Sequence, residues 1–190
     1  MEVFAIFSAF GLSASAGLNA YIPLLVIALI AKFTHLINLK QPWDGLTSWW
    51  IIGLLVILCL VEFLADSSPA INHVNDVIQT VIRPTAGAIA FAAGSGVFGE
   101  VHPVLALGCG LFIAGGVHAV KSAVIRPAVT ATTAGTANLP VSMAEDFTST
   151  VVSILSLVVP VVVAAIIILI TAWLVQKLWI RMKTSRATPA

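Results

Sequence analysis

Charged residues are scarce in this chain. Asp, Glu, Lys and Arg make up 9% of its 190 residues, whereas hydrophobic residues make up 59%. In soluble globular proteins about a quarter of the residues are charged. The formal net charge of +1 leaves no basic face for phosphates, so we expect no nucleic-acid partner. The composition therefore predicts an integral membrane protein whose main partner is a lipid bilayer.

Side-chain clusters for metal binding or hydrolysis are also missing from the sequence. Its only two cysteines, Cys59 and Cys109, lie within apolar runs and have no CxxC partner. The four histidines are scattered, and neither a nucleophile elbow nor a nucleotide-binding loop is present. We therefore expect no metal, no cofactor and no enzymatic activity.

Long uncharged windows mark the expected membrane segments, because a spanning helix needs about 20 apolar residues. The first window resembles a signal peptide, but the acidic Glu2 opposes that interpretation and we expect a retained segment. The sequence predicts an all-α polytopic integral membrane protein, with broken or re-entrant segments and an internal repeat, in one transmembrane domain over residues 1–176. The expected transmembrane helices, about five in number, cover residues 3–31, 46–65, 85–99, 103–120 and 147–176.

Basic residues predict the orientation of these helices. Four lie in the tail 177–190 and two in the first loop: Lys177, Arg181, Lys183, Arg186, Lys32 and Lys40. The positive-inside rule places the tail and the first loop in the cytoplasm, and five crossings would then place the N-terminus outside.

Small residues recur at every fourth position in three of the expected helices. Because residues i and i+4 share a helix face, small side chains there let neighbouring backbones approach closely. We expect these positions to pack helices together: Ala9, Ser13 and Gly17; Ala86, Ala90 and Gly94; Ala106, Gly110 and Ala114.

A V-I-R-P motif occurs twice, first in HVNDVIQTVIRPTAG from His73 to Gly87. Polar residues of this copy fall on one face of an amphipathic helix over 71–83, which we expect to end at Pro84. That polar face comprises Asn72, Asn75, Asp76, Gln79 and Arg83, and Glu62 and Asp66 precede it at the end of the second span.

The second copy is HAVKSAVIRPAVTATTAG, from His118 to Gly135. Here His118, Ser122, Arg126 and Thr130 form a ladder with a spacing of four, flanked by Lys121, and we expect Pro127 to interrupt the helix. Residues 127–144 are rich in Thr, Gly, Ala and Pro, which predicts an irregular or re-entrant segment.

Two interpretations of these polar segments are open. Each could lie in the membrane interface with its arginine extended to the headgroups. Alternatively, a repeated pair of broken, polar-faced segments is what many transporters use to contact their cargo. The repetition favours the second interpretation, and we expect Arg83 and Arg126 to lie close together or to line one cavity.

A second pair of motifs predicts interrupted helices. AGLNAYIP begins at Ala16 and AGTANLP at Ala134, and Gly, Asn and Pro free backbone groups that protein or water must satisfy. Asn19 and Tyr21 are the expected polar contacts of the first motif, with helix packing and capping as the alternative. After the second, Ser142 and Glu145 match a capping box that opens the last span.

Several stretches together resemble one family of small bacterial membrane proteins, known as domain of unknown function 4126. They are AGLNAYIPLL, VEFLAD at the end of a span, HVNDVIQTVIRPTAG and the late RPAVTATTAG. The resemblance covers nearly the whole chain and implies a protein of the bacterial inner membrane. It implies no activity.

Three functions remain open, of which we expect the first: a transporter or channel for an ion or small polar solute, with the proton as a candidate coupling ion. The alternatives are a translocase of anionic lipids, in which Arg83 and Arg126 hold a phosphate, and a non-transporting assembly module. We expect a homo-oligomer, because a bundle this small has little interior for so many polar groups. The expected path is formed by Asn19, Tyr21, Glu62, Asp66, His73, Asn75, Asp76, Arg83, His118, Lys121 and Arg126.

Overall fold

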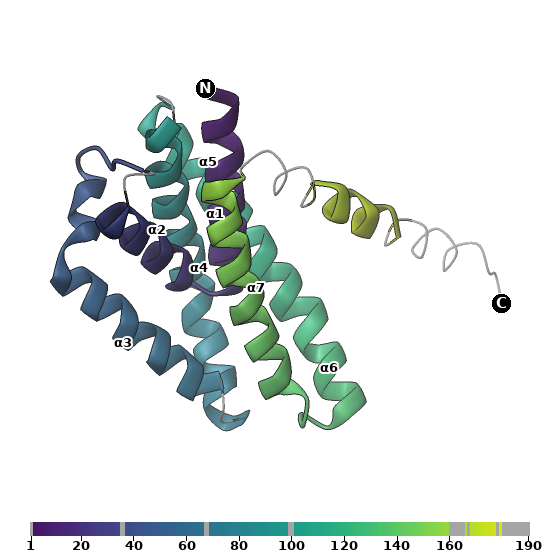
Figure 1. Ribbon diagram of the computed structural model, residues 1–190. Coiled ribbons are helices and arrows are strands. Elements are labelled where there is room, and N and C mark those ends of the chain that lie inside the picture. Colours follow the sequence, from purple (N-terminus) through teal and green to yellow (C-terminus); the bar gives the residue numbers. More distant parts are fainter. Residues whose placement is uncertain are drawn as a thin grey trace.

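The computed structural model describes residues 2–34, 37–66, 69–98, 101–159, 166, 168–177 and 179. Within these ranges, the side chains of residues 2–4, 66, 69–74 and 97–98 are not described. Over this part of the chain the regular structure is helical and no strand occurs, which confirms the all-α fold (Figure 1). Three described segments are long and apolar enough to cross a membrane: Asn75–Gly96, Pro103–Thr133 and Asn138–Val158.

The first uncharged window forms a helical hairpin instead of one spanning helix. Helix α1 (Glu2–Leu18) and helix α2 (Ile22–Phe33) are separated at the AGLNAYIP motif. The Asn19 Oδ1 atom accepts hydrogen bonds from the backbone N–H groups of Tyr21 and Ile22 at 3.0 and 3.1 Å, and so caps the start of α2. Figure 1 shows the turn inside the bundle, not at its edge. The N-terminus was expected on the outer side because residues 3–31 were counted as one membrane crossing. These residues form two helices, so that count no longer supports the expectation.

The first V-I-R-P copy lies within one long helix. After a short 3-10 helix (Trp43–Thr47) and α3 (Trp49–Asp66), helix α4 runs from Pro69 to Phe98 with Pro84 inside it. The expected end at Pro84, between an amphipathic helix over 71–83 and a span over 85–99, is therefore wrong. The close packing of α4 against its neighbours carries the helix through the proline; the Pro84 ring, for example, lies against Gly115.

The second copy lies in a continuous rod of three helical segments: α5 (Pro103–Val120), a π-helix (Lys121–Ile125) and α6 (Arg126–Thr133). The residues on both sides of the π-helix keep helical backbone angles, so the rod continues through Pro127 and the expected interruption of the helix there is wrong. The expected irregular segment 127–144 is thus mostly helical. Its irregular part is a turn over 134–137, in which Ala134 and Gly135 have positive φ angles of 51° and 85°.

Helix α7 (Asn138–Val158) follows this turn. It begins before Ser142 and Glu145, which lie inside it and do not form the expected capping box. It also ends long before residue 176, so the single span expected over 147–176 is wrong. A separate apolar helix, Ile168–Lys177, comes later in the chain and projects away from the bundle in Figure 1.

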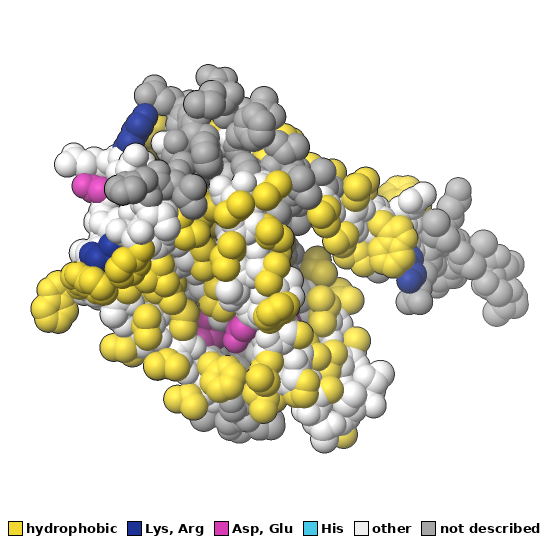
Figure 2. All heavy atoms as spheres, viewed as in Figure 1, with side chains coloured by type: hydrophobic (Ala, Val, Ile, Leu, Met, Phe, Trp, Pro, Cys, Tyr) yellow, Lys and Arg dark blue, Asp and Glu magenta, His cyan; other side chains and the backbone are white. Residues whose placement is uncertain are grey.

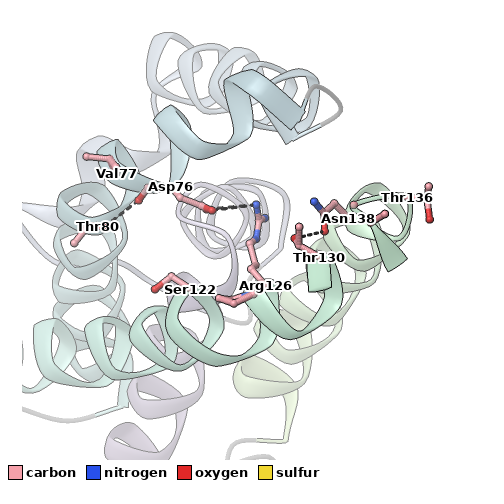
Figure 3. A pocket seen from close by; sticks show the side chains of 11 residues that line it. Asp76, Val77, Thr80, Ser122, Arg126, Thr130, Thr136 and Asn138 are labelled. Atoms are coloured by element: carbon pink, nitrogen blue, oxygen red, sulfur yellow. Dashed lines mark hydrogen bonds and ion pairs between the residues drawn. The ribbon is translucent and has the colours of Figure 1, made fainter. Parts of the chain in front are cut away.

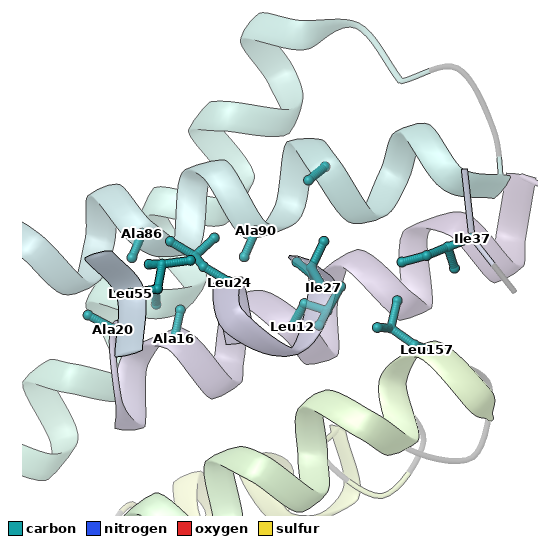
Figure 4. Packing of buried hydrophobic residues seen from close by; sticks show 12 residues of the cluster. Leu12, Ala16, Ala20, Leu24, Ile27, Ile37, Leu55, Ala86, Ala90 and Leu157 are labelled. Atoms are coloured by element: carbon teal, nitrogen blue, oxygen red, sulfur yellow. The ribbon is translucent and has the colours of Figure 1, made fainter. Parts of the chain in front are cut away.

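The bundle core forms where α1 meets α4 and α5. All nine small residues expected to pack helices are buried: Ala9, Ser13, Gly17, Ala86, Ala90, Gly94, Ala106, Gly110 and Ala114. A Cβ atom added to Gly17 would lie 2.6 Å from the Ala114 carbonyl oxygen, and one added to Gly94 would lie 3.2 Å from the Ala9 Cα atom. Backbones therefore touch at these positions. Larger side chains, among them Leu12, Leu24 and Ile27, fill the space between the hairpin and the other helices (Figure 4).

The first half of α4 turns apolar side chains outward and polar side chains inward. On the first half of α4, Val77, Ile78 and Val81 are 66%, 52% and 71% exposed, whereas Gln79 and Arg83 are buried. Apolar side chains cover much of the face drawn in Figure 2, with acidic side chains visible in its middle. An amphipathic helix lying in the membrane interface would turn its polar face to water. The polar face of α4 is instead turned into the bundle.

Candidate functional site

Seven ionisable side chains form two groups inside the bundle, here together called the buried ionic network: Glu62, Arg83 and His118 in one, and Asp76, Arg126, Glu145 and Lys121 in the other. Thr80 links the two groups, because its hydroxyl contacts both His118 and the Asp76 carbonyl oxygen. The seven side chains come from α3, α4, α5, the π-helix, α6 and α7. Arg83 is 1% exposed and Lys121 is 2% exposed. Charges buried to this extent are costly unless they are paired, so the pairing of each member matters.

Arg83 is the central cation of one half of the network. Its Nη2 atom donates to Glu62 Oε1 at 2.7 Å, a short charge-assisted hydrogen bond. Its Nη1 atom lies 3.3 Å from His118 Nδ1 and 3.5 Å from the Gly17 carbonyl oxygen. Arg83 thus joins α3, α4, α5 and the end of α1 at a single point.

The hydrogen bonds of His118 determine which of its ring nitrogens carries a proton. A guanidinium can only donate, so His118 Nδ1 accepts from Arg83 and carries a lone pair. The single ring proton is then on Nε2, which donates to Thr80 Oγ1 at 3.3 Å. The Thr80 hydroxyl donates its own proton to the Asp76 carbonyl oxygen at 2.9 Å. His118 is therefore neutral in this arrangement. A second proton would have to bind to Nδ1, where it would point at the Arg83 Nη1 donor.

Glu145 joins the two cations of the other half. Its Oε2 atom lies 2.6 Å from Lys121 Nζ and 3.5 Å from Arg126 Nη2. Arg126 also contacts Asp76, with 3.4 Å between its Nη1 atom and either carboxylate oxygen. This half therefore alternates in charge from Asp76 to Arg126, Glu145 and Lys121.

The π-helix places Lys121 and Arg126 on the same side of the rod. Residues five apart in an α-helix diverge around the axis, but the wider turn of a π-helix brings them onto one face. Both side chains are consequently buried, while Thr130, the last member of the expected ladder, is exposed. Lys121 was expected only to flank this ladder and is instead more deeply buried than Arg126.

The turn between α1 and α2 places backbone carbonyl groups beside Arg83 and Lys121. Lys121 Nζ donates to the Leu18 carbonyl oxygen at 3.0 Å, and Arg83 reaches the carbonyl of Gly17, the preceding residue. These carbonyls end α1, where unpaired C=O groups carry partial negative charge. On the other side of the turn, Asn19 Nδ2 donates to Asp146 Oδ1 of α7 at 2.9 Å. The broken helix therefore contributes to the electrostatics of the network.

A pocket of about 730 Å³ opens onto one end of the network (Figure 3). Figure 3 shows Asp76 and Arg126 pointing toward one another in it, with the Thr130 hydroxyl directed to Asn138. Its polar lining is completed by Thr80, Ser122 and Thr136. The lining therefore combines apolar residues, among them Val77 and Pro127, with hydroxyl and amide groups around one ion pair, which suits a small ligand with polar groups.

Most of the residues expected on the path converge in this region. Tyr21 and Asn75 are half-buried, Asn19 is buried at the hairpin turn, and the other described members belong to the network. The side chains of Asp66 and His73 lie outside the described part of the structure. Arg83 and Arg126 both point into the bundle, but only Arg126 lines the pocket.

The sequence analysis missed several participants. Glu145 was assigned to a helix cap, and its partner Lys121 is 24 residues away in the chain, beyond the reach of any local pattern. Ser15 was not singled out either, although its Oγ atom lies 2.8 Å from Ser149 Oγ and 2.6 Å from Ser153 Oγ. The available signal was the spacing of four between Ser149 and Ser153, which places both on one face of α7.

Comparisons with known proteins give one match. The model of the family described as Domain of unknown function (DUF4126) matches residues 6–180, which confirms the family indicated by the sequence motifs. No curated protein and no solved structure matches the chain.

Proposed function

The chain belongs to the DUF4126 family, whose description assigns no activity, and from its own side chains we propose that it is a membrane transporter or channel for an ion or small polar solute. The observation that carries this proposal is the buried ionic network beside a pocket that contains one of its ion pairs. Ionisable groups within a membrane bundle are costly, and they usually mark the route of a solute, an ion or a proton.

Insertion in a bilayer is the first part of the proposal. The inverted distribution of α4, with exposed valine and isoleucine and a buried arginine, suits a helix surrounded by lipid. We propose a polytopic bundle in the bacterial inner membrane, with the tail 177–190 in the cytoplasm and α1–α2 as a re-entrant hairpin. Irregular backbone at membrane depth is tolerated where it is buried in protein, as the hairpin turn is here.

The route is the second part. A solute would enter the pocket between Asp76 and Arg126, whose separation of 3.4 Å is long for an ion pair and whose side chains are 20% and 10% exposed. Beyond them, Glu145 and Lys121 lead toward the hairpin turn and the Arg83 half of the network. A long, partly exposed ion pair exchanges partners more readily than the buried pairs behind it, which makes it a suitable first contact.

The experiment is a flux screen with the purified full-length chain in liposomes. Protons, sodium, potassium, chloride, phosphate, small amino acids and labelled lipids would be offered in turn. Passage of an ion or small solute supports the proposal. Movement of labelled lipid alone would instead identify a lipid translocase. If none of the species crossed the liposome membrane, the protein would be an assembly module.

Arg126→Gln and Asp76→Asn are expected to lower the flux of the identified solute at least about tenfold, because each removes a charge-assisted hydrogen bond worth about 1.5–3 kcal/mol. Thr132→Val is the control, since Thr132 is exposed on α6, bonds to carbonyls of its own helix and does not line the pocket. Equal flux through all three variants and the parent would show that the solute does not pass this pocket.

A further inference from the structure

The buried ionic network has too few hydrogen-bond donors. Six buried side-chain atoms in the described part of the chain have no hydrogen-bond partner: Ser8 Oγ, Glu62 Oε2, Asp76 Oδ1, Gln79 Oε1, Arg83 Nε and Glu145 Oε1. Four of them are carboxylate or amide oxygens, which can only accept while the carboxyls are ionised. Arg83 Nε can only donate, and the Ser8 hydroxyl can donate or accept. Protonation of a carboxylate would convert one of these unpaired acceptors into a hydrogen-bond donor.

Charge pairing accounts for the ion pairs but not for these unpaired oxygens. The three carboxylates of the buried ionic network, Glu62, Asp76 and Glu145, accompany three cations, Arg83, Lys121 and Arg126. His118 does not add a positive charge, because its Nδ1 atom accepts from Arg83. The network is therefore formally neutral, and Asp146 is a further carboxyl group close to Glu62.

Glu62 is the most deeply buried carboxylate of the buried ionic network. Glu145 contacts two cations, and Asp76 is partly exposed in the pocket. Glu62 is 3% exposed, and its ion-pair partner, Arg83, is shared with His118 and a backbone carbonyl. Its second oxygen, Oε2, has no hydrogen-bond partner among the described residues.

Among the described residues, Gln79 offers an unpaired hydrogen-bond acceptor on the face of α4 that also carries Arg83, the partner of Glu62. Gln79 lies four residues before Arg83 on the same face of α4, is 2% exposed, and its Oε1 atom has no partner in the described part of the chain. Other elements present Lys121, Asp146 and Tyr21 to Glu62, and Cys59 lies on its own helix. Among these groups Lys121 is engaged by Glu145 and Leu18, so it does not neutralise Glu62 directly.

We infer that Glu62 binds a proton on Oε2 and that the proton is the ion coupled to transport. The carboxylate becomes a carboxylic acid, and no other bond breaks. Arg83 keeps its bond to Oε1, while the new O–H group is directed to the amide oxygen of Gln79. The coupling part of this inference rests on the proposed function, whereas the proton site does not.

The test is infrared difference spectroscopy of the full chain in detergent between about pH 8 and about pH 6, a range in which exposed Asp and Glu side chains stay ionised. We expect acidification within this range to produce the carbonyl band of a protonated carboxyl group, absent in Glu62→Gln and present in Asp76→Asn and Glu145→Gln. Loss of the band in either of the latter variants, or its absence from the parent, would overturn the inference. If Glu62→Gln does not fold, Glu62→Asp keeps a carboxyl group in a changed position and should shift the frequency of the band; an unchanged band in Glu62→Asp would also overturn the inference.

Sodium titration at fixed pH and liposome flux complete the test. A spectrum that responds to sodium and not to acid would contradict a proton site. Flux through the parent is expected to change over roughly pH 5 to 8, and flux through Glu62→Gln to lose that change. A carboxyl band without any flux would support the proton site and contradict the transport proposal. Flux without the band would support transport and contradict the proton site.

Discussion

Glu145→Leu is expected to lower the free energy of unfolding by about 3–5 kcal/mol, the usual cost of removing one partner from a buried ion pair. The substitution leaves Lys121 buried beside an apolar side chain, with the Leu18 carbonyl as its remaining contact. Arg126 loses the same carboxylate but keeps Asp76. Thermal or denaturant unfolding of the purified protein in detergent measures the loss.

Two further variants separate charge from packing. Glu145→Gln keeps the shape and an acceptor oxygen, so it should lose less stability than the leucine variant. Combining Lys121→Met with Glu145→Leu removes both charges and should recover part of the loss, because matched apolar pairs often replace buried ion pairs without cost. If the double variant were no more stable than Glu145→Leu, the Lys121–Glu145 contact would not be the source of the effect.

Gly110→Leu is expected to separate α4 from α5 and to lower the free energy of unfolding by about 3 kcal/mol, because the interior there has no room for a side chain. A Cβ atom on Gly110 would overlap the Gly87 carbonyl oxygen and would lie 2.6 Å from Ala88 Cα. Backbone atoms cannot move aside as a flexible side chain can. Thermal stability and size-exclusion behaviour in detergent measure the effect.

Gly108→Leu is the matched control for this prediction. Gly108 lies on the same helix, and an added Cβ atom would meet nothing within 4 Å. We expect this variant to keep the stability of the parent. Equal stability of the two leucine variants would mean that α4 and α5 do not pack as described.

Local patterns predicted much of the site. The spacing of small residues identified the faces on which α1, α4 and α5 meet, and the polar face over 71–83 identified the side of α4 that carries Arg83. These predictions succeeded because residues three and four apart share a face in any helix, whatever surrounds it. The direction of the polar face, toward the bundle or toward the interface, was not available from the same pattern.

Prolines were a poor guide to helix ends. Pro84 and Pro127 were both expected to break helices, yet α4 passes through Pro84, and the rod of α5, the π-helix and α6 passes through Pro127. The cost of a proline depends on whether its position needs an N–H group and on what packs beside the ring. Both conditions are set by neighbouring helices and by the exact place where a helix starts.

The helical class, the apolar character of the segments and the residues that share a face of each helix were all readable from the amino-acid sequence, because they follow from composition and from periodicity within about ten residues. The hairpin of α1 and α2, the contacts of Arg83 with Glu62 and Gly17, and the link from Lys121 through Glu145 to Arg126 became visible only in the packed bundle. Those contacts join separate helices. Their partners are selected by which buried charges can be paired when the helices pack, and that selection is a property of the whole bundle.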